Sequence, residues 1–523
     1  MDTQTLLPIF TAAPTFELNP SGKAPLSGLV TVETVRPCRV EVMVDDGEAS
    51  RVLPVGDVKA TSHRLPVLGL KPARDYVLRV SAIDGAGRRV VHDEGFRFST
   101  APLPKDLPAI ELRHADPARM APGVTLIGVR KSARLGAKQY GYLVAVDAAG
   151  EVVWLRETGH VIGDVKRLRN GNIIYLTFDN RAIELDWLGN EVASWYAAAR
   201  WPSVHAGTDV IPVAADAFHH EIFEMENGNF LVLSVETREL EGYPSSETDL
   251  EAPREAATVV GDVAVEFRRD GTVVDTWNLF DILDPYRIGY GTISDYWVRK
   301  GIPNSRDWTH TNSVIHDPSD DSLVFSVRHQ DAVIKIDRKT KALKWVLGTH
   351  DGWTGDWADK LLTPHDGLDW PYHTHNATVT PAGTVLLFDN GNHRAVPGQA
   401  KLPMDRNYSR AAEFRVDEAA GTVAQVWQSR KPAPGEPSNY SPFISGAQWL
   451  GDSGTVLVCF GGMLSDDDGN ITDDTQIALG HVRIAEVTHD DMAETVFELA
   501  IDERDKGLGW DVYRALRLDG LYR

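Results

Sequence analysis

The sequence predicts an all-β protein: a six-bladed β-propeller preceded by a small β-sandwich of the fibronectin or immunoglobulin type. Three observations carry this prediction. The N-terminal part alternates apolar and polar residues in short runs, the remainder repeats one β-hairpin pattern, and a second repeat of two strands precedes most of these hairpins. We therefore expect a sandwich at residues 1–100, a proline-rich linker at 101–115 and a catalytic propeller at 116–523.

Short strands with turn signals between them fill residues 20–100, as in Leu29-Val-Thr-Val-Glu33. Turns are indicated by pairs such as Asp46-Gly47. The stretch Leu70-Lys-Pro-Ala-Arg-Asp-Tyr76 resembles the tyrosine corner of fibronectin-type sandwiches. The segment Ala101-Pro-Leu-Pro-Lys-Asp-Leu-Pro108 then has the composition of a linker.

Beyond the linker, a strand, a turn and a second strand ending in an aromatic residue recur six times, at 143–154, 182–195, 263–277, 333–345, 412–427 and 482–497. Two-strand units that fit the inner half of a blade precede most of them, at 164–176, 221–233, 376–388 and 447–457. Units of four short strands indicate a propeller, because no blade can bury both of its faces alone. The unequal spacing predicts long inter-strand insertions at 236–260, 280–309 and 348–372.

The bulk composition narrows the function. With 523 residues, 42% of them hydrophobic and 24% charged, the chain has the size of a globular protein with more than one domain. A net charge of −22 argues against nucleic acid and against anionic membrane, and it favours a small-molecule partner. Cys38 and Cys459 are too far apart in the sequence for a disulfide framework, and P-loop, GxSxG and HExxH motifs do not occur. We expect no cofactor and no metal.

The first residues lack the basic and apolar segments of a signal peptide, and no run of about eighteen apolar residues occurs. The sequence thus favours a cytoplasmic protein without membrane contact. By analogy alone, the sandwich is a candidate surface for a homodimer.

Polar residues concentrate between Asp307 and Arg394, at the ends of short apolar runs. Aligning the inner-strand units on their turn glycine places His220 and His375 at equivalent positions, with His310 within one residue of the same register. Innermost strands line the channel of a propeller, so equivalent residues converge on its axis. A single histidine is more often structural, but three on one ring predict a catalytic site.

Other residues complete the candidate site. Arg394 follows an Asp-Asn-Gly turn, and its guanidinium suits a sulfate, phosphate or carboxylate. The insertions carry aromatic residues that fit a lid over an aromatic ligand: Tyr286, Tyr290, Tyr296, Trp297, Trp353, Trp357, Trp370 and Tyr372. As substrate-binding candidates we select His219, His329, Asn312, Asn376, Tyr286, Tyr440, Ser465 and Arg514.

Several motifs carry a resemblance: His219-His220 before a Glu-Asn-Gly-Asn turn, the segments 307–314 and 328–336, His375 with Phe388-Asp-Asn-Gly-Asn-His-Arg394, Tyr440-Ser-Pro442, and Tyr513-Arg514-Ala-Leu516. In these motifs the sequence resembles the bacterial arylsulfate sulfotransferases, which move a sulfuryl group from one phenol to another without a nucleotide donor. The resemblance covers roughly residues 110–523, and the sandwich also has a counterpart in that family.

The resemblance implies that His310, His375 and Arg394 bind the sulfuryl oxygens and handle the phenol proton. It also implies a further histidine that becomes transiently sulfated, shortly after a Phe-Gly-Gly in the last blade. Here Phe460-Gly461-Gly462 leads to Ser465 without a histidine, so the expected nucleophile is missing at that position.

Four hypotheses stay open at the level of the sequence. The first is sulfuryl transfer or aryl-sulfate hydrolysis, and the second is a lyase that uses histidine acid–base chemistry on a phenolic substrate, as in retro-aldol release of an aldehyde. A metal-dependent enzyme with a histidine-ligated ion on the propeller axis is the third, and a non-enzymatic binding module is the fourth.

Overall fold

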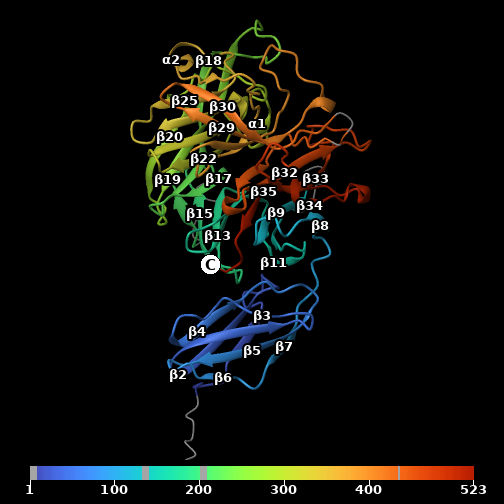
Figure 1. Cartoon of the computed structure of the whole chain (residues 1–523). Coiled ribbons are helices and arrows are strands. Elements are labelled where there is room, and N and C mark those ends of the chain that lie inside the picture. The colour runs from blue at the N-terminus through green and yellow to red at the C-terminus, as the bar shows by residue number, and fades with distance from the viewer. Residues whose placement is uncertain (1–8, 132–140, 201–208, 434–435, 437, 523) are drawn as a thin grey trace, which may run out of the picture.

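The computed structural model describes residues 9–131, 141–200, 209–433, 436 and 438–522, and it confirms the predicted combination of a sandwich and a six-bladed propeller (Figure 1). The sandwich, blue in Figure 1, lies below the propeller, whose blades run from cyan to red. Regular helix is rare in the described ranges: it comprises α1 (Tyr296–Arg299), α2 (Gly355–Ala358) and the short 3-10 turns η2 (Leu279–Asp281), η3 (Arg328–Gln330), η4 (Met404–Arg406), η5 (Gly451–Ser453) and η6 (Arg504–Lys506). None of the described helices has the length and apolar character needed to span a membrane.

The sandwich is organised around one long strand, β2, which pairs with four others. The Tyr76 hydroxyl accepts a hydrogen bond from the Lys71 backbone N–H at 2.8 Å, so the predicted tyrosine corner is present. The strands are β1 (Thr15–Leu18), β2 (Gly28–Asp45), β3 (Ser50–Val52), β4 (Ala60–Val67), β5 (Asp75–Ile83), β6 (Arg89–Val91) and β7 (Phe96–Ser99).

Each propeller blade is built on four antiparallel strands, the innermost of which lines the axis, and β16, β21 and β26 add to their blades by parallel pairing. From the inside outward, the first three blades are β35 (Trp510–Leu518), β9 (Val124–Lys131), β10 (Gly141–Val146), β11 (Val152–Glu157); β12 (Ile162–Arg167), β13 (Ile173–Thr177), β14 (Arg181–Leu185), β15 (Glu191–Ala197), β16 (Ile211–Val213); and β17 (His219–Glu224), β18 (Phe230–Tyr243), β19 (Glu255–Phe267), β20 (Val273–Asn278), with β21 (Ser305–Asp307) paired to β19.

The last three blades follow the same plan. They are β22 (Thr311–Asp317), β23 (Ser322–Val327), β24 (Ala332–Asp337), β25 (Leu343–Gly348); β27 (His375–Val379), β28 (Val385–Asp389), β29 (Arg410–Asp417), β30 (Thr422–Gln428), β26 (Thr363–Pro364); and β31 (Gly446–Trp449), β32 (Thr455–Ser465), β33 (Leu479–Thr488), β34 (Thr495–Ile501), β8 (Glu111–Ala115).

The aromatic residue that ends a predicted hairpin fastens one blade to the next. Trp154, Trp195 and Trp277 are fully buried on the outer strands of three consecutive blades. Their indole N–H groups donate to backbone carbonyls of the following blade, those of Trp187 (2.8 Å), Arg269 (2.8 Å) and Arg338 (3.0 Å) respectively. The sequence repeat thus reflects a repeated contact: each tryptophan buries its ring between two sheets and satisfies its one donor there.

The segment 236–260 differs from the expectation of an irregular insertion. It lengthens β18 and β19 into one continuous hairpin, paired from Phe230↔Phe267 to Tyr243↔Glu255. The strand pattern continues because both segments alternate in burial and carry several β-branched residues.

Two pairings close the propeller ring. β35, late in the sequence, is the innermost strand of the first blade and pairs with β9, while β8, which precedes all other propeller strands, is the outermost strand of the last blade and pairs with β34 (Figure 1). The sandwich shares one apolar core with these blades, in which Val30 and Leu78 belong to the same cluster as Ile127 and Leu499.

Candidate functional site

Polar residues reach the propeller axis at irregularities of the innermost strands. The pairing register shifts within β12, β17, β22, β27 and β35. Such bulges re-aim side chains that a regular strand would direct into the sheet packing. At or next to them, His220, His310 and Asn376 adopt the left-handed conformation, with φ of 57°, 45° and 55°. Left-handed backbone at residues other than glycine is costly and gathers at functional sites.

One group of these residues is charged and internally paired. We call Asp164, Lys166, Glu221 and Arg514 the charged cluster. Nη1 of Arg514 donates to Asp164 Oδ1 at 3.1 Å and to Glu221 Oε2 at 2.5 Å, and Lys166 Nζ lies 2.7 Å from Glu221 Oε1. Burial raises the pKa of Asp164 to about 6. Arg514, expected to bind substrate, thus uses its charge to tie β35 to two neighbouring blades.

The second group, which we call the histidine cluster, comprises His220, His310, His329 and His375. Burial lowers the pKa of all four side chains well below the usual value, so they are neutral near pH 7. The His220 and His310 rings lie 4.9 Å apart, and those of His310 and His329 lie 4.6 Å apart. The structure therefore brings together the predicted catalytic residues His220 and His310 with the predicted binding residue His329.

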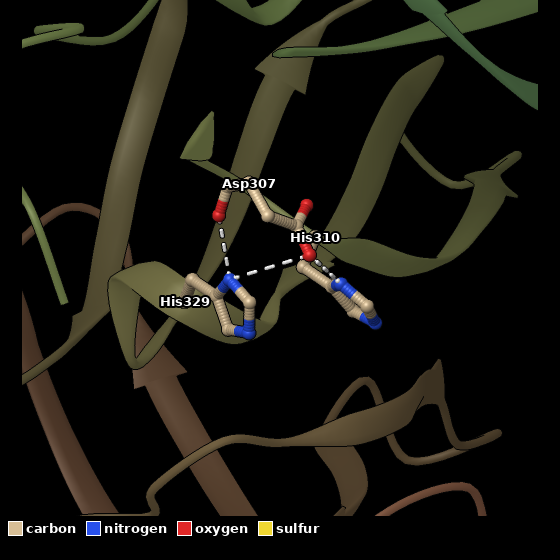
Figure 2. Close-up of side chains that lie close together, drawn as sticks. All are labelled: Asp307, His310 and His329. Atoms are coloured by element: carbon tan, nitrogen blue, oxygen red, sulfur yellow. Dashed lines mark hydrogen bonds and ion pairs between the residues drawn. The ribbon is translucent and has the colours of Figure 1, made fainter. Parts of the chain in front are cut away.

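His310 is held by a carboxylate. Its Nδ1 lies 2.5 Å from Asp307 Oδ2 (Figure 2), and Asp307 Oδ1 accepts a second hydrogen bond from Trp297 Nε1 at 3.0 Å. Burial raises the pKa of Asp307 to about 6, so the carboxylate is ionised at neutral pH. It then accepts the Nδ1 proton of His310 and leaves the Nε2 lone pair of that ring available as a base.

His329 is engaged at both nitrogens. Nδ1 lies 2.6 Å from the main-chain oxygen of Asp307 (Figure 2), and Nε2 lies 2.9 Å from Arg328 Nη1, which donates to it. The chain packs closely here, since a Cβ on Gly291 (φ +95°) would lie 2.6 Å from His329 Nε2. The ligand atoms of Asp307, His310 and His329 all lie within 4.8 Å of one another, a spacing suited to a metal ion. Both Nδ1 atoms nevertheless face oxygens of Asp307 as hydrogen-bond donors, which favours a proton network over a metal site.

His375 has a different partner, a neutral amide. Its Nδ1 lies 2.6 Å from Asn390 Oδ1, while the amide nitrogen of Asn390 donates to the backbone oxygens of Ser441 (2.7 Å) and Ile444 (3.2 Å). These two carbonyls fix the amide so that its oxygen faces the ring. His375 must therefore carry its proton on Nδ1, and its Nε2 lone pair has no hydrogen-bond partner among the described residues.

His219 positions His220. The Nδ1 atoms of the two rings lie 2.7 Å apart, and His219 Nε2 lies 3.2 Å from the Ser234 backbone oxygen and 3.3 Å from Asp262 Oδ1. His219 is thus anchored on the sheet side. His220 keeps its Nε2 free of protein partners within the described ranges.

Arg328 was not selected from the sequence, although it directly precedes His329 and follows a buried strand. Nη2 donates to the Pro442 backbone oxygen at 2.8 Å, and the buried Nε has no hydrogen-bond partner in the part of the chain that the structure describes. Next to burial, the Arg328 charge is the largest influence that lowers the pKa of His310 and of His375. This places a cation beside two members of the histidine cluster. Asp307 was not selected either, although its position three residues before His310 could have identified it as a partner of that histidine.

Arg394 is paired through one of its three guanidinium nitrogens. Nη2 donates to Asp389 Oδ2 at 3.0 Å and to the Tyr408 backbone oxygen at 2.9 Å, and its Cζ lies 3.7 Å from the centre of the Tyr408 ring. Its Nε and Nη1 are buried without a partner among the described residues. The structure does not bring Arg394 into contact with the histidine cluster.

The remaining predicted substrate-binding residues divide into those buried between or near the inner strands and those that lie away from the histidine cluster. Asn312 and Asn376 connect blades, since Asn312 Nδ2 donates to the Thr374 backbone oxygen at 2.7 Å and Asn376 Oδ1 accepts from the Ala447 N–H at 3.1 Å. The buried Tyr440 hydroxyl has no partner in the described ranges, and the Arg328 charge acts on it.

Two candidates lie away from the histidines. The Tyr286 hydroxyl donates to the Glu241 backbone oxygen on the β18–β19 hairpin, and Ser465 Oγ accepts from Arg504 Nη1 at 2.8 Å. Tyr286 was predicted to bind substrate because it lies in an insertion, but this side chain contacts the lengthened β18–β19 hairpin instead. The structure thus brings neither side chain to the histidine cluster.

A six-bladed propeller with neutral, tautomer-fixed histidines and a buried arginine on its axis is suited to proton transfer and to oxyanion binding. The chain belongs to the arylsulfotransferase family: the family model described as Arylsulfotransferase (ASST) matches residues 111–509. A second model, the arylsulfotransferase Ig-like domain, matches residues 15–94. These matches confirm the family predicted from the motifs and make the chain a member of a family of enzymes.

Two curated relatives are arylsulfate sulfotransferases named AssT. The one from Escherichia coli O6:H1 (strain CFT073) is 33% identical over 248 residues, 40% of each chain, and the one from Lelliottia amnigena is 30% identical over 239 residues, 38% of this chain and 39% of the relative. The matches thus span about two fifths of each relative. Among solved structures, a Bacteroides caccae protein of unknown function aligns at a TM-score of 0.30 and 11% identity, over 75% of this chain and 93% of that one.

Proposed function

We propose that this protein transfers a sulfuryl group from an aryl sulfate to a phenol, with His375 as the group that carries it. One observation supports this most directly: Asn390 holds the proton of His375 on Nδ1, which leaves a neutral imidazole whose Nε2 lone pair has no hydrogen-bond partner among the described residues. A neutral nitrogen of fixed tautomer is a competent nucleophile. Membership of the arylsulfotransferase family supports this class of reaction. The aryl sulfate donor and the phenol acceptor are part of the proposal.

In the first half-reaction, Nε2 of His375 attacks the sulfur of the donor. An S–N bond forms as the S–O bond to the ring breaks, and the leaving phenolate oxygen takes a proton from Nε2 of His310, a ring that is neutral in the free enzyme and takes up this proton when the anionic donor binds. Ionised Asp307, at 2.5 Å from Nδ1, stabilises the imidazolium before it gives up this proton.

In the second half-reaction, neutral His310 removes the proton of the acceptor phenol. The phenol oxygen attacks the sulfur, the S–N bond to His375 breaks, and the product aryl sulfate departs. His310 is protonated again and returns this proton to the solvent when the anionic product leaves, so protons balance over the cycle and the ring is neutral in the free enzyme. The two histidines differ in their partners, and this separates their roles: an amide suits the nucleophile and a carboxylate suits the acid–base group.

Arg328 would bind the sulfuryl oxygens. Its buried guanidinium has an unused Nε and influences both His310 and His375. Negative charge accumulates on these oxygens as the bonds to sulfur exchange, and a fixed, desolvated cation stabilises that charge. This role replaces the one that the sequence suggested for Arg394.

The test combines turnover with detection of the intermediate. Para-nitrophenyl sulfate as donor and phenol as acceptor should yield nitrophenol and phenyl sulfate, and donor alone should leave one sulfuryl group on the peptide that contains His375, detected by mass spectrometry. His375→Asn serves as the control. The proposal fails if neither free nitrophenol nor phenyl sulfate forms at high enzyme concentration, or if the label lies on another residue. Release of an aldehyde from a hydroxyalkyl phenol would instead favour the lyase.

A further inference from the structure

The helix α1 connects the histidine cluster to the protein surface. At its start, the Tyr296 ring lies 4.9 Å from the His310 ring, and Trp297 donates to Asp307, the carboxylate that orients His310. Lys300 caps the C-terminus of this helix. A short segment therefore links the acid–base pair to an exposed cation.

Three aromatic rings surround the Lys300 ammonium. Nζ lies 4.8 Å from the centre of the Tyr296 ring, 5.4 Å from that of Trp297 and 5.7 Å from that of Phe178. Phe178, which lies between β13 and β14, is 53% exposed. Ring faces attract the ammonium, and they also keep water from part of its surface, which strengthens its interaction with an anion.

Lys300 has no carboxylate within ion-pair distance in the part of the chain that the structure describes, although the protein has a net charge of −22. Its neighbour Arg299, by contrast, pairs with Asp295 at 3.2 Å. After burial, the Lys300 charge is among the influences that lower the pKa of His220 and of His310. The ammonium is thus near the site, exposed, and free to bind an anion.

We propose that Lys300 is a specificity-determining residue that binds an anionic substituent, a carboxylate or a sulfonate, on the aromatic ring of the substrate. This inference rests on the proposed function. The inference is supported by two successive contacts of Tyr296. Its ring contacts the ring of His310 and also the ammonium of Lys300, so the ammonium lies one aromatic ring beyond the acid–base group. A substrate whose ester oxygen meets His310 extends its own ring over the same interval. Its para substituent then reaches Nζ, with Phe178 and Tyr296 beside the ring.

The preferred donors would therefore carry two negative groups, the sulfate ester and a second anionic substituent. The preferred acceptors would carry one anionic substituent in addition to the hydroxyl group. Arg328 binds the sulfuryl oxygens, and Lys300 binds the group at the opposite end. Two cations that bind opposite ends of the substrate would also favour one orientation, because reversal would bring a carboxylate to the site of transfer.

The experiment compares two donors of similar length, para-carboxyphenyl sulfate and para-methylphenyl sulfate. Lys300→Gln should lower kcat/KM for the carboxylated donor by roughly tenfold, the effect of losing one charge-assisted contact, and leave the methylated donor within about twofold. Lys300→Arg should keep most of the preference. Arg299→Gln removes the same charge one residue away, from a side chain already paired with Asp295, and should change neither donor.

Equal losses for both donors, or no loss for either, would overturn the inference. Failure of the proposed function is distinguishable, because it would abolish transfer from both donors in the wild type. Lys300 is then tested by binding alone: isothermal titration calorimetry should show tighter binding of para-hydroxybenzoate than of para-methylphenol in the wild type, and Lys300→Gln should remove this difference. Equal binding of both phenols to the wild type would overturn the inference.

Discussion

The two polar clusters near the propeller axis share one inner strand, β17, but differ in how their partners are used. In the charged cluster, Asp164 and Glu221 both accept from the guanidinium of Arg514, so the charges of the cluster are paired with one another. In the histidine cluster, His220, His310 and His375 each have one ring nitrogen held by the protein, while Nε2 is without a partner among the described residues.

Along strand β17, neighbouring residues therefore differ in role: one contributes to stability and the other is available for chemistry. His220 and Glu221 are adjacent in β17, yet Glu221 neutralises Arg514 while His220 offers a free lone pair. A buried ion pair has little left with which to bind a substrate, and removing one partner exposes an uncompensated charge. A neutral ring with one nitrogen held can exchange a proton or a sulfuryl group at the other. The following variants test this separation, from the largest expected effect to the smallest.

His375→Asn should have the largest effect. The asparagine can still meet Asn390 in place of Nδ1, but it lacks Nε2, so transfer should fall by at least about a thousandfold. Unfolding by denaturant should be nearly unchanged, because the buried hydrogen bond is kept. A parallel loss of stability and activity would place His375 with the structural residues.

Arg514→Met should act on stability. It leaves Asp164 and Glu221 buried without their shared cation, which should lower the free energy of unfolding by about 3–5 kcal/mol, measured by denaturant titration. The loss should shrink as the pH falls, since the carboxyl pKa values in the folded variant rise and the folded state takes up protons. Adding Glu221→Gln should restore part of the stability. A stable Arg514→Met protein without activity would contradict the assignment.

Asp307→Asn should reduce the rate of sulfuryl discharge to the acceptor by about a hundredfold, because His310 loses the carboxylate that fixes its tautomer. The pKa of Asp307 is about 6, so in the wild type this rate should fall as the pH drops through about 6, when the carboxylate becomes protonated. Single-turnover measurements over pH would show that limb. If the variant retained it, another group would be responsible.

Arg394→Gln should have the smallest effect. Asp389 keeps a second partner, Arg410 Nε at 2.8 Å, and is not left as an uncompensated charge, so the loss of stability should be smaller than that of Arg514→Met. The value of kcat/KM should stay within a few fold of the wild type. Arg328→Gln, the matched comparison, should lower kcat/KM by about a hundredfold. Reversal of the two results would return the oxyanion role to Arg394.

The fold was accessible from the sequence because its signals are local. Glycines such as Gly150 and Gly189 take the left-handed conformation that their tight turns require, and a tryptophan such as Trp154 ends five of the six hairpins. Alignment of these repeats also identified His220, His310 and His375 as neighbours on the axis. Their equivalence is a property of the repeat and needs no tertiary information.

The partners of those histidines were not accessible in this way. Asn390 orients His375 across a strand pair, and Arg328 reaches the cluster from a 3-10 turn, so neither occupies a repeated position. Arg394 adopts a left-handed backbone, with φ of 41°, and its side chain stacks on Tyr408, which no pattern indicates. The histidine that the resemblance implies after Phe460-Gly461-Gly462 is absent at that position of the sequence, and the proposed function assigns its role to His375 in another blade.

The double closure of the ring sets the order in which the protein can become functional during synthesis. β8 emerges from the ribosome before any other propeller strand, but its partner β34 comes almost four hundred residues later, and β35 follows. Until β35 is inserted, Asp164 and Glu221 lack Arg514, and the ring is open between its first and last blades. The propeller should therefore remain incomplete until β35 has been made, and a chain without this strand should be unable to support the proposed transfer.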